Sequence, residues 1–199
     1  MGPMAFRAPP LPTHERAHHT ERLIRERGTD TARWAHLESL ATQWDARAVL
    51  AAEWIPDYVR VLDVGAGAMT LGSLLKPGCS YTPADVVERR PGCHVADLNR
   101  QEFPPGNYDW VTFLGVLEYV HDVDWPLRRA GACAPAMIVT YCTFTGGDVS
   151  ARRGMGWVND LGAPEFEAAL SRNGWTIRRQ QEVKRGPTNI QIMFSCSRT

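Results

Sequence analysis

The sequence lacks long apolar runs and carries no excess of charge of either sign. No stretch approaches the roughly 18 consecutive apolar residues that a membrane-spanning helix requires. The 22 Lys and Arg residues balance 22 Asp and Glu residues, which argues against a protein that mainly coats nucleic acid. The first twelve residues include four prolines and lack the apolar segment of a signal peptide. We therefore expect a cytoplasmic protein with neither a membrane nor a nucleic acid as its partner.

The few cysteines offer no framework for disulfides or metal binding. Their number is odd, they are widely spaced, and no two of them form a C-x-x-C pair. We expect reduced, mostly packed thiols and no bound metal. The five are Cys79, Cys93, Cys133, Cys142 and Cys196.

The 199 residues suffice for one domain with a substantial core. Proline-rich residues 1–13 show no apolar periodicity, so we expect them to be disordered or loosely docked. Residues 14–57 are predicted to form a helical cap. Residues 58–199 are predicted to form a Rossmann-like domain.

Two helices are predicted within the cap. The first, over residues 14–27, is polar almost all round and is expected to be peripheral or mobile. The second begins at Asp30, an N-cap residue type, and its apolar residues recur at three- and four-residue spacing as far as Ile55. A restart at Asp45 is the alternative, and Pro56 ends the helix in either case.

After residue 56, short apolar runs alternate with turns and helical stretches. This alternation is typical of an α/β fold with a parallel sheet. The prediction is a doubly wound, mostly parallel seven-stranded sheet with helices on both faces. The predicted strands cover residues 59–64, 81–87, 94–97, 110–114, 137–144, 175–183 and 190–196.

A glycine-rich turn follows the first predicted strand. Gly65 and Gly67 allow the backbone to approach a ligand closely, and the helix that follows offers unpaired N–H groups. Asp85 stands 22 residues after Asp63, where an acid at the end of the second strand can accept hydrogen bonds from ribose hydroxyls. The pair predicts an adenosine site. It does not choose between a dinucleotide and S-adenosylmethionine.

The segment Val61-Leu62-Asp63-Val64-Gly65-Ala66-Gly67 resembles motif I of class I S-adenosylmethionine-dependent methyltransferases of the small-molecule type. Three later segments resemble further motifs of that family in the same order. They are residues 81–85 for the end of the second strand, 94–99 for the third-strand motif and 108–122 for the fourth-strand motif. Residues 156–175 resemble the family's closing helix and strand.

The resemblance implies a binding role for each matching residue. The glycine turn would pass beneath the cofactor, Asp85 would hold the ribose, Asp97 would border the adenine, and Gly115 would line the sulfonium side. Arg47 resembles the arginine that meets the methionine carboxylate. The full implied set for S-adenosylmethionine, with S-adenosylhomocysteine as product, is Arg47, Asp63, Gly65, Ala66, Gly67, Asp85, Val86, Asp97, Leu98, Leu114 and Gly115.

Three positions depart from related patterns. Met69 stands where the family has its third glycine, and Tyr119 replaces the usual histidine of the fourth-strand motif. A dinucleotide fingerprint would require glycine at position 70, which is Thr70. A dinucleotide site is therefore the less favoured interpretation.

Methyl transfer is an in-line displacement, so the protein mainly has to align the acceptor. A general base is needed only where the acceptor is protonated. The candidates are Tyr119, His121 and Tyr141, with Glu118 nearby. His121 is the most attractive because histidine titrates near neutral pH, and the neighbouring Asp122 and Asp124 would favour its charged form. The alternatives are that His121 is a surface histidine and that Tyr119 is an ordinary packing residue.

The absence of two motifs makes some classes of substrate less favoured. No Asn/Asp-Pro-Pro-Tyr segment and no Pro-Cys pair follows the fourth strand, which disfavours exocyclic-amine and cytosine C5 methylation. Arg152, Arg153 and Trp157 are expected in a glycine-rich loop, where the arginines would either grip an anionic acceptor or be solvated.

The predicted function is methyl transfer from S-adenosylmethionine to an O or N atom of a small molecule, in a biosynthetic role. One alternative is a non-catalytic, methyltransferase-like partner or regulatory subunit. The other is an NAD-binding Rossmann protein. The oligomeric state is not predicted.

Overall fold

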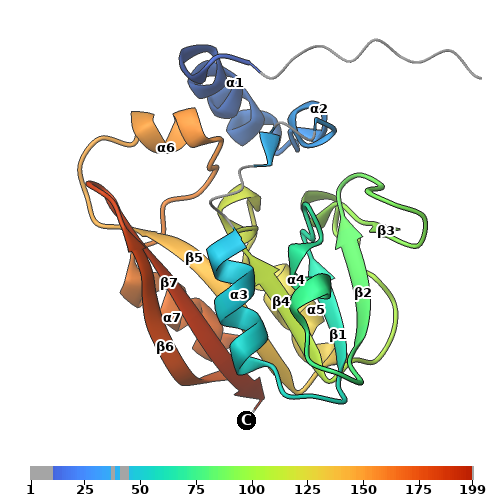
Figure 1. The fold of residues 1–199 in the computed structure, drawn as a ribbon. Coiled ribbons are helices and arrows are strands. Elements are labelled where there is room, and N and C mark those ends of the chain that lie inside the picture. Colours follow the sequence, from blue (N-terminus) through green and yellow to red (C-terminus); the bar gives the residue numbers. More distant parts are fainter. Residues whose placement is uncertain (1–10, 37–38, 41–44, 199) are drawn as a thin grey trace, which may run out of the picture.

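A seven-stranded sheet forms the centre of the structure, a computed structural model that describes residues 11–36, 39–40 and 45–198 (Figure 1). The strand order is β3-β2-β1-β4-β5-β7-β6, and only β7 runs antiparallel to its neighbours. The predicted doubly wound, mostly parallel sheet is confirmed. The strands are β1 (Arg60–Val64), β2 (Ser80–Asp85), β3 (His94–Val95), β4 (Trp110–Leu114), β5 (Ala136–Phe144), β6 (Trp175–Arg185) and β7 (Asn189–Arg198).

Helices cover both faces of this sheet. On one face, α3 (Asp45–Trp54) and α4 (Thr70–Leu74) pack on the sheet through residues such as Ile55 and Leu71. On the other, α5 (Asp124–Cys133) and α7 (Ala163–Arg172) bury Leu127 and Phe166 against the strands. Successive residues of one strand serve opposite cores, because strand side chains alternate between the two faces. Among the described residues, no helix is both long and apolar enough to cross a membrane.

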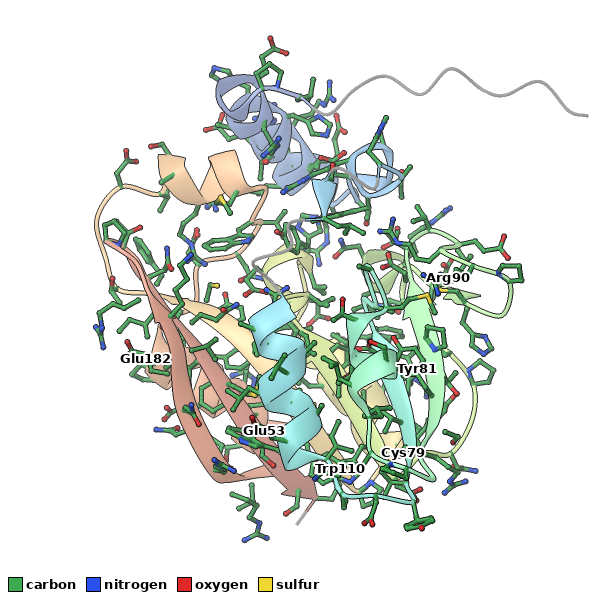
Figure 2. All side chains as sticks on the ribbon, in the orientation of Figure 1. Glu53, Cys79, Tyr81, Arg90, Trp110 and Glu182 are labelled. Atoms are coloured by element: carbon green, nitrogen blue, oxygen red, sulfur yellow. The ribbon has the colours of Figure 1, made fainter. Side chains whose placement is uncertain are left out.

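The remaining helices gather at one end of the sheet. Figure 1 shows α1 (Thr13–Glu26), α2 (Thr31–Trp34) and α6 (Ser150–Met155) at the end where the parallel strands finish. Figure 2 shows Glu53, Cys79 and Trp110 at the opposite end. In an open α/β sheet, ligands bind outside the carboxyl ends of the strands, so the cap lies where a site is expected.

The long second helix predicted for the cap is wrong. Asp30 does cap a helix, since its carboxylate accepts a hydrogen bond from the Arg33 amide at 3.2 Å. However, α2 ends at Trp34, and among the described residues the next α-helix begins at Asp45, as the alternative had it. The Arg33 side chain turns inward and donates to the Met155 carbonyl at 2.7 Å, which ties this short helix to the α6 region. Part of the predicted periodicity, including Trp44, lies outside the described residues.

The first cap helix is docked rather than peripheral. Thr20 is buried, and its hydroxyl donates to the Arg153 carbonyl of α6 at 2.9 Å. Arg16 donates to the Gly154 carbonyl at 3.4 Å. The prediction for α1 is wrong because it rested on the lack of apolar periodicity. The helix docks through hydrogen bonds to backbone carbonyls, and such contacts leave no apolar pattern in the sequence.

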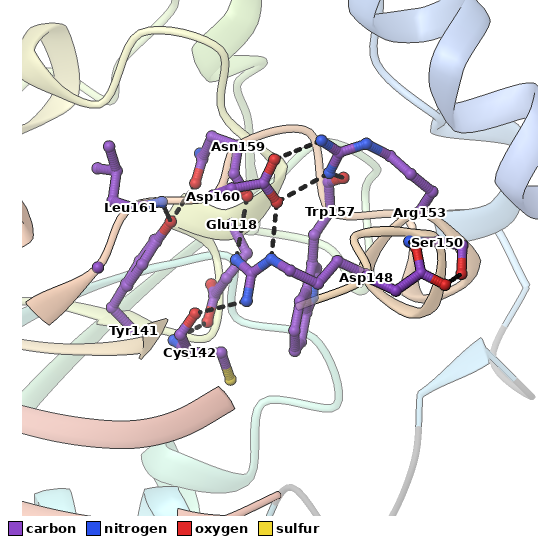
Figure 3. A network of polar contacts seen from close by, with 12 residues as sticks. Glu118, Tyr141, Cys142, Asp148, Ser150, Arg153, Trp157, Asn159, Asp160 and Leu161 are labelled. Carbon is purple, nitrogen blue, oxygen red and sulfur yellow. Dashed lines mark hydrogen bonds and ion pairs between the residues drawn. The ribbon is translucent and has the colours of Figure 1, made fainter. Parts of the chain in front are cut away.

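The expectation of a loop at Arg152 and Arg153 is also wrong, because both residues lie in α6. The guanidinium of Arg152 is only 1 % exposed. It donates to Asp160 at 2.7 Å, to the Cys142 carbonyl at 3.1 Å and to the Asn159 carbonyl at 3.0 Å (Figure 3). The paired arginines hold the pKa of Asp160 below its usual range against the opposing effect of burial. The guanidinium of Arg152 therefore makes its contacts inside the protein and is not free to bind an anionic methyl acceptor.

Replacing Arg152 with leucine should lower the free energy of unfolding by about 2–5 kcal/mol, because the Cys142 and Asn159 carbonyls would lose their donor and the half-buried Asp160 carboxylate would keep only Arg153. Urea unfolding followed by circular dichroism measures this. Arg178→Leu is the matched control, since Arg178 is exposed on β6 and bonds Ser197 at the surface. Equal losses for the two variants would contradict the structural role of Arg152.

Candidate functional site

A cavity of about 200 Å³ opens at the carboxyl ends of β1, β2 and β4. Every residue of the implied cofactor set borders it, including Arg47 from α3 and Gly115 after β4. The cap adds Thr29, Trp34 and Leu40, which the sequence analysis did not identify. No local motif marks these three as site residues, because only the docking of the cap brings them to the sheet.

Close packing explains the glycines of the turn after β1. Gly65 has a φ of +75°, and a Cβ there would lie 2.2 Å from Cγ2 of Val116. Its amide donates to the Ala84 carbonyl of β2 at 2.8 Å, and the amide of Ala66 donates to the same oxygen. Any side chain at 65 would therefore push the turn away from both neighbouring segments. Gly67 also lies in the left-handed region, with a φ of +53°.

Met69 adopts the conformation that usually calls for glycine. Its φ is +62° and its ψ is 25°, and it is the N-cap residue of α4. An L-residue pays about 1–2 kcal/mol for a left-handed backbone. The turn thus keeps the backbone path that a third glycine would take, although the residue differs.

Asp85 links the glycine turn to the end of β2. Oδ2 accepts from the Gly67 amide at 2.8 Å and Oδ1 accepts from the Val86 amide at 2.7 Å. The Arg89 guanidinium approaches both oxygens, with Nε 3.3 Å from Oδ2, and donates to the Trp34 carbonyl at 2.6 Å. Asp85 is only 7 % exposed. Its two backbone donors hold the carboxylate at the cavity wall.

Asp63 is a buried structural acid at the edge of the same cavity. Its two carboxylate oxygens accept from the Thr112 hydroxyl of β4 at 2.6 Å and from the Tyr81 hydroxyl of β2 at 2.7 Å. Burial raises the pKa of Asp63 above its usual range, and these two hydrogen bonds oppose the shift. Asp63 therefore ties three neighbouring strands together where the cavity begins.

Asp97 joins the far end of the cavity to the cap. Its Oδ1 accepts from the Thr29 hydroxyl at 2.8 Å and from the Asn99 amide at 3.0 Å. The Asn99 side chain in turn donates to Thr29 and to the Tyr119 carbonyl, both at 3.0 Å. Leu98 lies beside Asp97 in the cavity wall. The third-strand motif and the cap thus form one hydrogen-bonded rim.

Gly115 makes room for Arg47. A Cβ at position 115 would lie 2.1 Å from the Arg47 Nη1 atom, and the φ of Gly115 is +74°. The guanidinium therefore rests directly on the backbone after β4. Arg47 and Gly115 both also border a second cavity.

That second cavity adjoins the first and has a volume of about 290 Å³. Tyr119 borders both, together with Arg47 and Gly115. The wall is completed by residues from the segment after β4, β5, the segment around α6 and the β6–β7 hairpin. These residues are Glu118, Cys142, Met155, Trp157, Lys184, Gly186, Pro187, Asn189 and Gln191.

The three proposed catalytic residues have different positions. Tyr119 reaches both cavities, and its ring meets the edge of Trp34 at 4.9 Å between centroids. Burial raises the pKa of its phenol. The Arg33 guanidinium lies 4.4 Å from the ring centre of Trp34 and 5.7 Å from that of Tyr119. Tyr119 is thus clamped between the cap and the sheet.

His121 and Tyr141 are not among the residues that border either cavity. The His121 imidazole lies 3.0 Å from the Gly28 carbonyl of the cap. Nearby, the Asp124 carboxylate bonds Arg172 and Asn173 instead of the histidine. Tyr141 is fully buried, stacks on Phe166 at 4.3 Å and bonds Asn159 (Figure 3). Both residues make structural contacts here, so their catalytic role stays a prediction.

No family model and no curated protein sequence matches this chain. Solved structures do match. The mitomycin 7-O-methyltransferase MmcR is similar over 95% of this chain and 69% of its own, with 18% identity and a TM-score of 0.66. The Burkholderia thailandensis 1,6-didemethyltoxoflavin-N1-methyltransferase, solved with its substrate and S-adenosylhomocysteine, matches over 96% and 92%, with 21% identity and a TM-score of 0.58.

The fold is that of the class I methyltransferases. The same fold also carries other chemistry, since the [4+2]-cyclase SpnF is similar over 77% of this chain and 80% of its own, with 14% identity and a TM-score of 0.61. Among the residues that the structure describes, no three His, Cys, Asp or Glu side chains are grouped so that they could hold a metal ion.

Met69→Gly should raise the free energy of unfolding by about 0.5–1 kcal/mol, because glycine removes the left-handed strain at a position where the methionine side chain is only partly buried. Chemical denaturation provides the measurement. Met155→Gly, at the last helical position of α6, should instead lower stability by about 1 kcal/mol. Destabilisation by both substitutions would show that Met69 packing outweighs its backbone strain.

Burial of Glu118 should make stability depend on pH. Burial raises the pKa of its carboxyl, so the native state binds a proton more tightly than the unfolded chain. As the pH rises above the ordinary glutamate pKa of 4.5, the free energy of unfolding of the wild type should therefore fall relative to that of Glu118→Gln. The fall should continue until the pH exceeds the raised pKa of Glu118. Urea unfolding of both proteins from pH 4 to pH 8 measures the difference. A constant difference across that range would contradict the assignment.

Proposed function

We propose that this protein is a methyltransferase that transfers the methyl group of S-adenosylmethionine to an O or N atom of a small molecule. One observation carries the proposal. All of the residues that the family resemblance assigns to the cofactor, from Arg47 to Gly115, border one cavity at the carboxyl ends of the central strands. They come from separate segments of the chain, so their convergence is not a consequence of sequence proximity.

The residues that border the cavity suit such a cofactor. A Cβ at Gly65 would collide with Val116 and one at Gly115 with Arg47, so the backbone at both positions of the cavity wall requires glycine. Asp85 is held by two amides in a position to accept hydrogen bonds from the ribose hydroxyls in place of Arg89. Asp97 and Leu98 would border the adenine, and the Arg47 guanidinium would pair with the methionine carboxylate.

When bound, S-adenosylmethionine supplies a methyl carbon that its sulfonium already activates. The protein then has to orient the acceptor and exclude water. Trp34 and Thr29 of the cap close the cavity on the side away from the sheet, and the Thr29 hydroxyl is fastened to Asp97. Arg47, Gly115 and Tyr119 form the boundary between the two cavities, where the acceptor would meet the methyl group.

A second candidate is a protein that holds the cofactor without transferring its methyl group. The similarity to the SpnF cyclase favours keeping this alternative. An NAD-binding protein is disfavoured because Thr70 breaks the dinucleotide fingerprint. Calorimetry with S-adenosylhomocysteine and with NAD distinguishes the two ligands. Transfer of radiolabelled methyl from S-adenosylmethionine to a panel of small phenols, amines and carboxylic acids distinguishes a methyltransferase from a non-transferring relative.

Wild-type protein should bind S-adenosylhomocysteine with micromolar affinity in isothermal titration calorimetry. Asp85→Ala should weaken binding by about 10- to 100-fold, because a hydrogen bond to a charged group contributes about 1.5–3 kcal/mol. Asp57→Ala provides the matched control, since Asp57 is exposed in the turn before β1. Unchanged affinity in Asp85→Ala would show that the ribose assignment is wrong. Binding of NAD but not of S-adenosylhomocysteine would overturn the proposed function.

A further inference from the structure

Glu118 borders the second cavity and has a buried carboxylate oxygen without a hydrogen-bond partner among the described residues. Glu118 lies in the short 3₁₀ segment Leu117–Tyr119, only 1 % exposed. Its Oε1 accepts from the Cys142 amide of β5 at 2.8 Å. Its Oε2 has no hydrogen-bond partner among the described residues. Burying a charged oxygen without a hydrogen-bond partner costs more free energy than burying a neutral polar atom in the same way. A bound molecule that donates a hydrogen bond to this oxygen would remove that cost.

Glu118 is fixed in place by the segments around it. Its carbonyl accepts from the Val158 amide at 2.8 Å, and its side chain is anchored through the Cys142 amide. The Cys142 carbonyl in turn accepts from Arg152 (Figure 3). The buried Arg152 therefore supports the strand that holds Glu118, although it does not itself pair with the carboxylate.

Charged and titratable groups surround this carboxylate from several elements. Arg47 of α3 favours its ionised form, whereas burial opposes ionisation. Glu118 in turn raises the pKa of the Tyr141 phenol and of the Cys142 thiol on β5, although burial is the larger cause for both. The neighbouring Tyr119 and, from β6, Lys184 also border the cavity. None of these groups is hydrogen-bonded to Oε2.

The rest of the lining suits a flat, largely apolar molecule. Met155, Trp157 and Pro187 contribute apolar surface to the lining, and Asn189 and Gln191 of β7 contribute polar groups. Trp157 is held from one side by the Arg152 guanidinium, whose carbon lies 4.6 Å from the ring centre. A rigid aromatic side chain of this kind provides a flat packing surface. The cavity meets the cofactor cavity at Gly115, so a molecule bound here would lie beside the methyl donor.

We propose that the second cavity binds a small aromatic acceptor that carries a hydroxyl or N–H group, and that Glu118 Oε2 accepts the proton of that group. This inference rests on the proposed function and adds the acceptor class and the base. The O–H or N–H bond breaks and its proton passes to Oε2. The electron pair left on the acceptor atom forms the bond to the methyl carbon, and the C–S electrons return to sulfur, which leaves as a neutral thioether.

Phenol and anisole test the inference without knowledge of the natural acceptor, because they share a ring and differ in the donor hydrogen. Dissociation constants from saturation-transfer NMR, with and without S-adenosylhomocysteine, provide the readout. Wild-type protein should bind phenol about tenfold more tightly than anisole. Glu118→Gln should lose this preference, because the amide nitrogen takes the place of Oε2 and cannot accept, while the remaining oxygen still accepts from Cys142.

Glu53→Gln is the matched control and should retain the preference, since Glu53 is exposed on α3 at the opposite end of the sheet (Figure 2). Unaltered circular dichroism of Glu118→Gln would show that its fold is intact. Equal binding of phenol and anisole to wild type, binding of neither, or a preserved preference in Glu118→Gln would overturn the inference. Binding of S-adenosylhomocysteine to the same samples reports on the proposed function separately. A phenol preference without such binding would overturn the proposed function and leave the hydroxyl site standing.

Discussion

The buried carboxylate of Asp63 holds three parallel strands together at the point where the cofactor cavity begins. It accepts from Thr112 on β4 and from Tyr81 on β2, while its own backbone belongs to β1. Two residues later the chain leaves the sheet, and the Gly65 amide bonds the end of β2. The position of the turn relative to Asp85 therefore depends on this one anchored junction. Because Asp85 also accepts from Gly67, the turn and Asp85 form a single hydrogen-bonded unit.

The cap is joined to this unit by polar contacts rather than by a large apolar interface. Thr29 bonds Asp97, Arg89 bridges Asp85 and the Trp34 carbonyl, and the Gly28 carbonyl lies within hydrogen-bond distance of His121. Arg33 reaches across to the Met155 carbonyl beside α6. Each contact connects the cap to a motif segment or to the neighbouring α6 region. The cap thus closes the cofactor cavity and, through Tyr119, also borders the second cavity.

Local sequence signals predicted some elements accurately and others poorly. The difference depends on whether local or tertiary interactions form the element. β4 was predicted at residues 110–114, where it lies, because its apolar run is bounded by polar and glycine residues. β3 was predicted too long, since Asp97 leaves the strand to cap a 3₁₀ turn with its own carboxylate. The Arg152 helix was missed because its glycine and two arginines signal a solvated loop. In the structure both arginines pair with Asp160, a contact that no local pattern encodes.

The sequence by itself determined the sheet, the glycine turn and the acids at the strand ends, because strand alternation and backbone conformation are local properties. All residues of the implied cofactor set border one cavity. Tertiary structure alone decided which polar residues after β4 face that region. Glu118 and Tyr119 reach the second cavity, whereas His121 faces the cap. That difference arises from the direction of the chain through one short 3₁₀ turn and from its packing against β5 and α6, which no local pattern encodes.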